Sequence, residues 1–308
     1  TTANTLKGYG AQGTGAWATG GALNTARSSI MPAGTQTAAI GAGGDYGIPA
    51  ASPTWARNTE TYDGSSWSDV ADLNLGRANG GGAGTQTAAL VVGGYIAPPT
   101  QFKKETEIYN GSTWSEVEDL NTGNYSFGFS AYGGTTTAAL IAGGSGSVPG
   151  TPPVSTTANT ETYNGTSWTE VNDLNTARHG GAGGGSTTSF IYAAGVPGGT
   201  NSESYDGTSW TATSAINTSR EDLGGAATSN TAALVFGGYA GSLPGTGATE
   251  SWDGSSWTEV ADLATGTYHV DGTGTSILAL RIGGFNPGAA TSTEEWSIPD
   301  ATKTFTSS

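Results

Sequence analysis

The chain has 308 residues and a formal net charge of −15 at pH 7, with 11% charged residues and 52 glycines. Its 10 Lys and Arg residues are too few and too scattered for a phosphate-binding patch, so no nucleic-acid partner is expected. The absence of cysteine excludes disulfides, Cys-ligated zinc and iron–sulfur clusters. No apolar run approaches the roughly 20 residues that span a bilayer, so no membrane insertion is expected.

An internal repeat runs along nearly the whole chain. Five segments share one phrase, which reads "TETYDGSSW", "TEIYNGSTW", "TETYNGTSW", "SESYDGTSW" and "TESWDGSSW". With an isolated copy near the N-terminus, the recurring tryptophans are Trp17, Trp67, Trp114, Trp168, Trp210 and Trp257. Successive tryptophans are 42 to 54 residues apart, a period typical of the blades of β-propellers.

Each period contains the same predicted elements in the same order. A small-residue stretch precedes an apolar strand such as "TAALVV", which ends in a glycine pair or, in one repeat, in Ala194-Gly195. A half-exposed strand such as "TETY" follows, then an Asp-Gly or Asn-Gly turn for which type I′ geometry is expected, then an outer strand that begins with Trp. The pattern predicts four antiparallel strands per blade and six blades around a channel.

The two ends of the chain predict how the ring closes. The repeats occupy approximately residues 24–73, 74–120, 121–174, 175–216, 217–263 and 264–299, and the sixth lacks its own Asx-Gly turn and tryptophan. Residues 13–23 carry a lone Trp strand that no inner strand precedes. We expect this N-terminal strand to complete the sixth blade, which removes two free sheet edges. Residues 1–308 then form a single propeller domain. The tail "ATKTFTSS" has the composition of one more extended segment, and the sequence leaves open whether it adds a strand to that blade.

The repeat resembles the kelch motif, in which a strand ends in two glycines and an acidic residue precedes Tyr-Asp, with a Trp about five residues later. The phrases "YNGTSWTEVNDLNTAR" and "GTQTAAL" are also similar to Gly/Thr-rich kelch-like arrays in structural proteins of marine tailed phages and some bacteria. The resemblance implies an all-β, six-bladed kelch-type β-propeller and favours a virion or tail protein. Some kelch propellers are copper oxidases resembling galactose oxidase, but that chemistry needs a Cys crosslinked to Tyr, and this chain has no Cys.

Charged and aromatic residues recur in register with the repeat. The acidic ring consists of Glu60, Glu107, Glu161, Glu203, Glu250 and Glu294, and the basic one of Arg27, Arg77, Arg178 and Arg220, with Asn124 and Thr267 in the two remaining repeats. A carboxylate ring suits cation binding or acid–base catalysis, but charges that repeat with the fold are usually structural, so we expect internal pairing. The recurring tryptophans could form exposed platforms on which sugar rings stack, or they could pack inside the blades. We expect them to pack inside the blades. His179 and His269, the only histidines, are in non-equivalent positions, so no metal site, cofactor site or catalytic triad is predicted.

The connections after the glycine pairs differ most between repeats. The first two, "DYGIPAASPTWARN" and "YIAPPTQFKKE", concentrate aromatic and basic residues, namely Tyr46, Trp55, Arg57, Tyr95, Phe102, Lys103 and Lys104. We expect the aromatics to be exposed and the group to contact a partner. The alternative is that these loops pack on one another. The short "GTQT" and "DGSS" turns are expected on the opposite, plainer face.

These observations favour a non-enzymatic structural or adhesion module at a virion or extracellular surface. Its partners are then other virion or surface subunits, or a host-surface receptor or glycan. A composition rich in Gly, Ser, Thr and Asn with few Lys supports that location. The alternatives are a glycan-binding propeller lectin with sites between blades, and a hydrolase or lyase on a propeller scaffold. The enzyme alternative calls for a carboxylate or His cluster that breaks the repeat symmetry, and the sequence suggests none.

Overall fold

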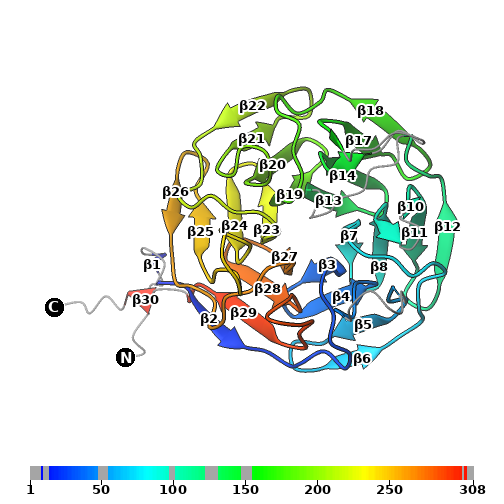
Figure 1. The fold of residues 1–308 in the computed structure, drawn as a ribbon, viewed down its shortest axis with the longest axis horizontal. Helices are drawn as coiled ribbons and strands as arrows, with labels where there is room; N and C mark the ends of the chain where they lie inside the picture. The colour runs from blue at the N-terminus through cyan, green and yellow to red at the C-terminus, as the bar shows by residue number, and fades with distance from the viewer. Residues whose placement is uncertain are drawn as a thin grey trace, which may run out of the picture.

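The strands of the protein form a closed ring of six blades around a central channel (Figure 1). The computed structural model describes residues 8–9, 14–47, 55–96, 101–121, 131–146, 155–299 and 302–303. Each blade is a four-stranded antiparallel sheet, and none of the described residues is helical. The predicted all-β, six-bladed propeller with four strands per blade is therefore confirmed.

The blades are numbered along the chain, and their strands are given from the channel outward. Blades 1 to 3 consist of β3 (Met31–Thr35), β4 (Ala38–Ala42), β5 (Thr59–Tyr62) and β6 (Trp67–Asp69); β7 (Gly81–Thr85), β8 (Ala88–Val92), β11 (Thr106–Tyr109) and β12 (Trp114–Val117); and β13 (Ala131–Thr135), β14 (Ala138–Ala142), β17 (Thr160–Tyr163) and β18 (Trp168–Val171). Blades 4 to 6 consist of β19 (Ala182–Ser186), β20 (Ser189–Ala193), β21 (Ser202–Tyr205) and β22 (Trp210–Thr213); β23 (Gly224–Ser229), β24 (Ala232–Phe236), β25 (Thr249–Trp252) and β26 (Trp257–Glu259); and β27 (Asp271–Gly274), β28 (Leu278–Ile282), β29 (Thr293–Ser297) and β2 (Ala16–Thr19).

The innermost strand of each blade is rich in glycine because neighbouring blades approach one another most closely near the axis. A Cβ atom on Gly272 in β27 would lie 2.7 Å from the carbonyl oxygen of Gly225 in blade 5. One on Gly133 in β13 would lie 2.6 Å from the carbonyl oxygen of Gly185 in blade 4. A larger residue at either position would push two blades apart.

The second strand of each blade supplies most of the hydrophobic core, which lies between blades. In β8, Val91 belongs to a buried cluster with Met31 and Ile40 of blade 1. The adjacent Leu90 points the other way, into a cluster with Ile141 of blade 3. A strand buried on both faces needs an uninterrupted apolar run, which explains why "TAALVV" does not alternate with polar residues.

The turn between the third and outer strands differs from the predicted type I′ geometry. Type I′ requires a positive φ at both central residues. Gly64 has a φ of 92°, but Asp63 is not among the residues with a positive φ. Instead, Asp63 begins a four-residue turn whose Tyr62–Trp67 flanks are paired, and its carboxylate accepts hydrogen bonds from the N–H groups of Ser66 and Ser65 at 2.8 and 2.9 Å. Those hydrogen bonds lower the pKa of Asp63 to about 2.

The N-terminal strand closes the ring, as predicted. Strand β2 pairs with β29, with Trp17 opposite Trp296, and is the outer strand of blade 6. The Trp17 indole donates to Thr249 Oγ1 of blade 5 at 3.1 Å. The described part of the tail, β30 (Thr302–Lys303), does not extend this blade but pairs with β1 (Gly8–Tyr9) in a separate two-stranded sheet beside blade 6 (Figure 1).

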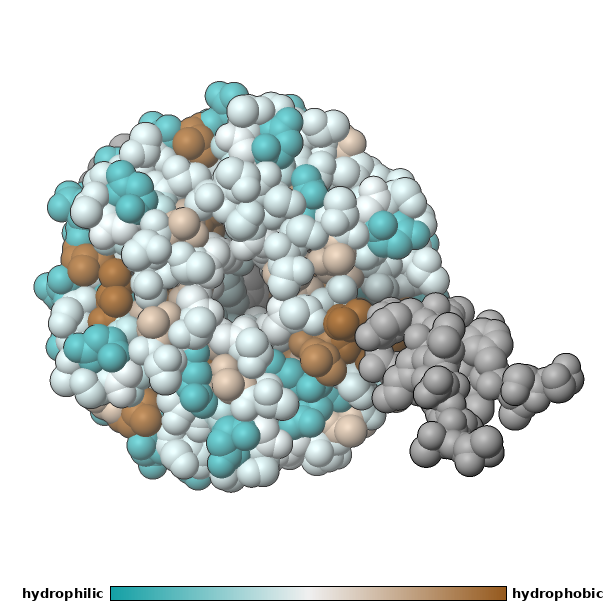
Figure 2. Space-filling view, turned by 180° about the vertical axis from the view of Figure 1, so that it is seen from behind, coloured by the Kyte–Doolittle hydropathy of each residue, from teal (hydrophilic) through white to brown (hydrophobic). Residues whose placement is uncertain are grey.

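The antiparallel strands give the ring two different faces. The hairpin face carries the short turns between the first and second strands and between the third and outer strands. The loop face carries the connections after the glycine pairs and the connections between blades. On the face shown in Figure 2, the described surface is mostly pale or hydrophilic, hydrophobic residues are scattered, and the channel forms a central hollow.

We expect deletion of residues 1–23 to abolish the single cooperative unfolding transition, because the outer edge of β29 becomes exposed and blade 6 loses its contacts through Trp17. Differential scanning calorimetry of this variant measures the effect. Deletion of residues 1–13 is the matched control, since it removes β1 but keeps β2. If the longer deletion melts at the parental temperature with the parental enthalpy, the N-terminal strand does not hold the ring closed.

Candidate functional site

The ring of glutamates is used inside the fold, as predicted. Four Arg–Glu pairs form on buried side chains, with N–O distances of 2.7 Å for Arg27–Glu60, 2.8 Å for Arg77–Glu107, and 2.9 Å for both Arg178–Glu203 and Arg220–Glu250. Each Arg lies in the connection that precedes a blade, and each Glu lies on the third strand of that blade. Asn124, the counterpart in blade 3, lies outside the described residues.

The second oxygen of each carboxylate is also occupied. It accepts a backbone hydrogen bond at 2.7 to 2.9 Å from the connection before the blade, donated by Asn24, Asn74, Asn121, Asn175, Asn217 or Ala264. Most of these carboxylates therefore hold both an Arg side chain and backbone N–H groups. Such a carboxylate has little capacity left for a metal ion or for proton transfer.

In blade 6 the cation near the third-strand glutamate comes from a different position, which was not predicted from the sequence. Thr267 replaces the usual Arg, but Arg281 on β28 is paired in register with Glu294 and donates to Ser292. Burial lowers the pKa of Arg281 to about 10, against the opposing effect of Glu294 and Asp271. The available signal was an Arg within the otherwise apolar strand "ILALRI".

The recurring tryptophans are packed rather than displayed, with the five at the outer hairpins buried. Each lies against an aromatic residue of the third strand, with ring centroids 5.0 to 5.2 Å apart for Tyr62–Trp67, Tyr109–Trp114, Tyr163–Trp168, Tyr205–Trp210 and Trp252–Trp257. Trp17 is half-buried between Trp296 and Phe236. A sugar ring therefore has no open face on the five buried rings to stack on.

The predicted partner-contact residues lie on the loop face, but their aromatic side chains are not exposed. Trp55, Tyr95 and Phe102 are half-buried, as is Tyr46, which donates to Asn58 at 2.5 Å. Trp55 packs on Tyr95 with ring centroids 4.6 Å apart, which joins the loops of blades 1 and 2. The expectation of exposed aromatics is therefore wrong, because the two loops cover each other's rings.

A short hairpin organises the second of these loops. Strands β9 (Tyr95–Ile96) and β10 (Gln101–Phe102) pair with Phe102 opposite Tyr95. A similar pair, β15 (Ser145–Gly146) and β16 (Ser155–Thr156), lies in the loop of blade 3. The basic residues differ in exposure: Lys103 is half-buried and lies 3.3 Å from Glu105, whereas Lys104 and Arg57 are exposed, with Arg57 Nε donating to the carbonyl of Leu73.

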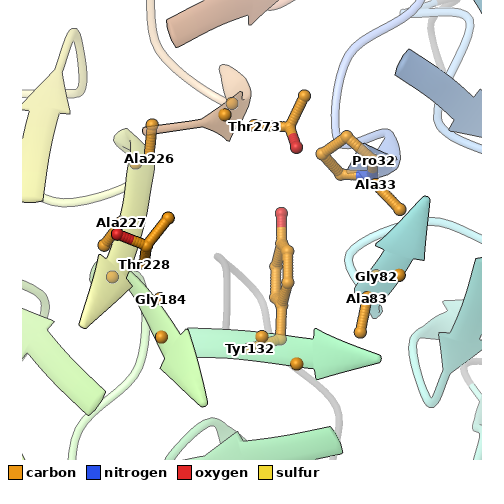
Figure 3. Close-up of a pocket in the computed structure, with 18 of the residues that line it drawn as sticks. Pro32, Ala33, Gly82, Ala83, Tyr132, Gly184, Ala226, Ala227, Thr228 and Thr273 are labelled. Carbon is orange, nitrogen blue, oxygen red and sulfur yellow. The ribbon is translucent and has the colours of Figure 1, made fainter. Parts of the chain in front are cut away.

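The channel contains a cavity of about 310 Å³ lined by the innermost strands of all six blades. Its walls are mostly glycine and alanine, and Tyr132 of β13 projects into the opening (Figure 3). Burial and the nearby Asp271 raise the pKa of Tyr132 well above 10, so its hydroxyl stays protonated and can donate a hydrogen bond. No charged side chain is among the residues that line this cavity.

In blades 1, 2, 4, 5 and 6, where the connection before the innermost strand is described, one register position per blade lies at the channel mouth on the loop face. Ser29, Asn79, Gly180, Asp222 and His269 all have a positive φ there, between 49° and 71°. Backbone hydrogen bonds join neighbours around the ring: Ser29 donates to His269 at 3.2 Å, Asn79 to Ser29 at 3.2 Å, and Asp222 to Gly180 at 2.7 Å. The backbone conformation at this position therefore repeats from blade to blade, whereas the side chain at it differs.

In blades 4 to 6 the ionisable side chains at and next to this position form an asymmetric cluster, which was not predicted from the sequence. His269 Nε2 lies 3.1 Å from Asp222 Oδ2. This contact links the connection before β23 in blade 5 to the connection before β27 in blade 6. Burial lowers the pKa of His269, but the hydrogen bond and charge of Asp222, with Asp45 and Glu221, outweigh it and the pKa is raised. Burial lowers the pKa of His179 at the entrance of blade 4, against the effect of Asp222. The repeat symmetry is therefore broken in blades 4 to 6.

A second cavity, of about 360 Å³, opens beside this cluster between blades 4 and 5. Its walls come from the loop after β20, from the connection before β23 and from the loop after β24, and they include Val196, Ser219, Glu221 and Tyr239. The loop after β20 is the shortest of the six, spanning residues 196–201. These loops differ in length and sequence between blades, but no motif in them predicts a site.

Comparison with known protein families found no family model that matches the chain, and a search of curated proteins likewise found no match. Among the described residues, no three His, Asp or Glu side chains are grouped so as to hold a metal ion. In the same part of the chain, no helix has the length and hydrophobicity needed to cross a membrane. The geometry defines a six-bladed β-propeller with a cavity in the channel, a cavity between blades 4 and 5, and an asymmetric cluster of ionisable side chains.

We expect Arg178→Met to destabilise the protein by about 3–5 kcal/mol, because it leaves Glu203 buried without its cation. Urea unfolding at pH 7 measures the loss. Lys104→Met is the control, since Lys104 is exposed and its side chain is in none of the described ion pairs or hydrogen bonds, and it should change stability by less than about 0.5 kcal/mol. Equal effects of the two substitutions would contradict a structural role for the Arg–Glu ring.

The two histidines should titrate on opposite sides of the ordinary value of 6.5, with His269 above it and His179 below it. Stability from the His269–Asp222 pair is fully present below about pH 6.5 and is lost as the pH rises through the folded pKa of His269. Proton NMR of the imidazole Cε1–H signals measures both values, and His179→Gln assigns them. A His269 pKa at or below 6.5 would contradict the pair.

Proposed function

We propose that the chain is a kelch-like propeller that acts as a non-enzymatic structural or adhesion module at a virion or extracellular surface. In this proposal the loop face binds a protein subunit or a surface receptor. The location is supported by the Gly/Thr-rich repeat phrases and by the scarcity of Lys. The fold alone would not identify a function, because propellers serve many.

One observation carries the proposal: the polar and aromatic groups that repeat in every blade are occupied by contacts within the fold. Each of the four Arg–Glu pairs is buried within the fold, and the hairpin tryptophans are covered by neighbouring rings. A partner must therefore be recognised by what differs between blades. On the loop face, those differences are the connections after the glycine pairs and the side chains at the channel mouth.

A glycan-binding lectin is the second candidate. The cavity between blades 4 and 5 lies where a lectin of this fold would place a sugar, and Tyr239 offers it an aromatic wall. The buried tryptophans weigh against a ring of equivalent sugar sites. A hydrolase or lyase ranks third: the His269–Asp222 pair breaks the repeat symmetry, as such an enzyme requires, but a His–Asp pair alone supplies neither a nucleophile nor a metal.

The distribution of lysine allows a direct test of the proposed binding face. The chain contains only Lys7, Lys103, Lys104 and Lys303, so its side-chain amines are confined to one loop of blade 2 and the two terminal segments. Amine-reactive cross-linking of the native assembly, followed by mass spectrometry, should give partner cross-links from Lys103 or Lys104. Exposed Lys104 should react most.

The matched control replaces Lys103 and Lys104 by Arg, which keeps the charge but removes the amine. Loop-face cross-links should disappear while assembly is retained. Partner cross-links that come only from Lys7 and Lys303 would place the contact at the terminal segments and refute binding through the loop face. A glycan array on the purified protein tests the lectin alternative separately.

A further inference from the structure

We propose that the cavity between blades 4 and 5 on the loop face is a receptor for a basic side chain, an arginine or lysine, presented by the protein partner. The inference rests on the proposed function in one respect, which is that the loop face meets a protein. It adds the position of the contact and the chemistry of the group that is bound.

A carboxylate and an aromatic ring stand side by side in this cavity. Glu221 and Tyr239 form an antiparallel bridge, with Tyr239 N–H donating to the Glu221 carbonyl at 2.7 Å and Glu221 N–H donating back at 3.0 Å. Directly opposed residues in such a bridge project their side chains on the same side, about 4.5–5.5 Å apart at Cβ. Both residues line the cavity. A cation placed between them meets a negative charge and the face or edge of a phenol ring.

The Glu221 carboxylate has no partner among the described residues. It takes part in no ion pair or side-chain hydrogen bond there, although it is half-buried. Burial and the neighbouring Asp222 raise its pKa, against the opposing effect of His269. A half-buried carboxylate without a counter-ion is stabilised by any cation that reaches it.

The other charges around the cavity cancel within the protein. Arg220 also lines the cavity, but its guanidinium is buried, pairs with Glu250 at 2.9 Å and donates to the carbonyls of Gly237 and Ala248. Asp222 is paired with His269. Glu221 is therefore the uncompensated charge of the cavity, in a protein whose net charge of −15 already attracts cationic partners.

The rim of the cavity favours a protein over a free amine. Among the described residues, the large hydrophobic side chains that are exposed are Val196, Leu243, Ile277 and Leu278. Val196, 36% exposed, lines the cavity, and Leu243, 71% exposed, lies on the same loop as Tyr239. A charged pocket beside exposed apolar residues has the composition of a protein–protein contact centre.

Other blades do not repeat this arrangement. The corresponding described bridges pair Ser28 with Asp45, Ala78 with Tyr95, His179 with Val196, and Tyr268 with Phe285. None of these places a carboxylate opposite an aromatic ring. The site is therefore single within the described part of the ring.

Binding of small probes to the purified full chain tests the inference. We expect N-acetyl-arginine methylamide to bind with a dissociation constant of about 1–10 mM, seen as chemical-shift changes at the backbone amides of Gly195, Tyr239 and Gly241. The neutral isostere N-acetyl-citrulline methylamide should bind at least tenfold more weakly. Glu221→Gln should weaken arginine binding at least tenfold, whereas Glu118→Gln, which removes an exposed carboxylate elsewhere on the loop face, should leave it unchanged.

A second arm tests whether the group comes from a protein. The peptide N-acetyl-Leu-Arg-Leu amide should bind at least fivefold more tightly than the single residue, and Leu243→Ser should remove that gain without altering the single residue's affinity. Equal binding of the peptide and the single residue would refute the protein contact. Binding of the citrulline derivative or of methyl glucoside as tight as that of arginine, or affinity unchanged by Glu221→Gln, would refute the cation site.

These outcomes are separable from the proposed function. Absence of any arginine binding up to about 50 mM would overturn the cavity assignment even if cross-links confirm a partner on the loop face. Conversely, arginine binding at Glu221 together with partner cross-links confined to the termini would overturn the proposed binding face. An unchanged melting temperature for Glu221→Gln verifies that a lost signal reflects the site, since the Glu221 side chain makes no described contact that the fold needs.

Discussion

Buried ion pairs between Arg and Glu connect the strands and loops of blades 1, 2, 4 and 5 near the loop face of the propeller. Arg27 in the connection before blade 1 donates to Glu60 on β5 and to the carbonyls of Gly43 and Asn58, each at 2.7 Å. One side chain thus ties the start of a blade to the end of its second strand and the start of its third. A buried pair adds little net stability over apolar packing, but a shifted register would leave a charge unpaired at a cost of several kcal/mol. We therefore expect the pair to act mainly by excluding wrong registers.

The repeat explains why the fold was predictable from the sequence. Five copies of the same phrase determine the blade spacing and strand order, because each copy provides the same information independently. The incomplete sixth repeat and the lone Trp17 segment then determine the number of blades and the closing role of Trp17. The errors concern single positions and contacts distant in the sequence. Asp63 caps a four-residue turn where type I′ was expected. In blade 6, Arg281 supplies the positive charge near Glu294 because Thr267 stands where other blades have an Arg. The ring of Trp55 in the loop of blade 1 packs on Tyr95 in the loop of blade 2. No local pattern encodes such contacts.

The asymmetric cluster could have been found by comparing repeats at the register of the channel mouth. Asp222 and His269 occupy the position that Ser29, Asn79 and Gly180 hold in other blades. Positions of equal register converge on a narrow circle in a propeller, so two ionisable residues in adjacent repeats become neighbours there. Non-equivalence of His179 and His269 suggested that the histidines were far apart. That reasoning overlooked Asp222, which interacts with both.

Loop length then decides which of these side chains a partner can reach. In blade 1 the carbonyl of Trp55 lies against Gly76, so the long loop after β4 covers the connection to blade 2. After β20 the loop spans only residues 196–201, and the corresponding connection around Glu221 lines an open cavity. Shortening one loop exposes framework positions that are hidden elsewhere, and a substitution at such a position then changes recognition without changing the fold. A propeller of near-identical blades can acquire a single binding site in this way, because the ring keeps its closure, its core and its Arg–Glu pairs while one interblade surface is opened.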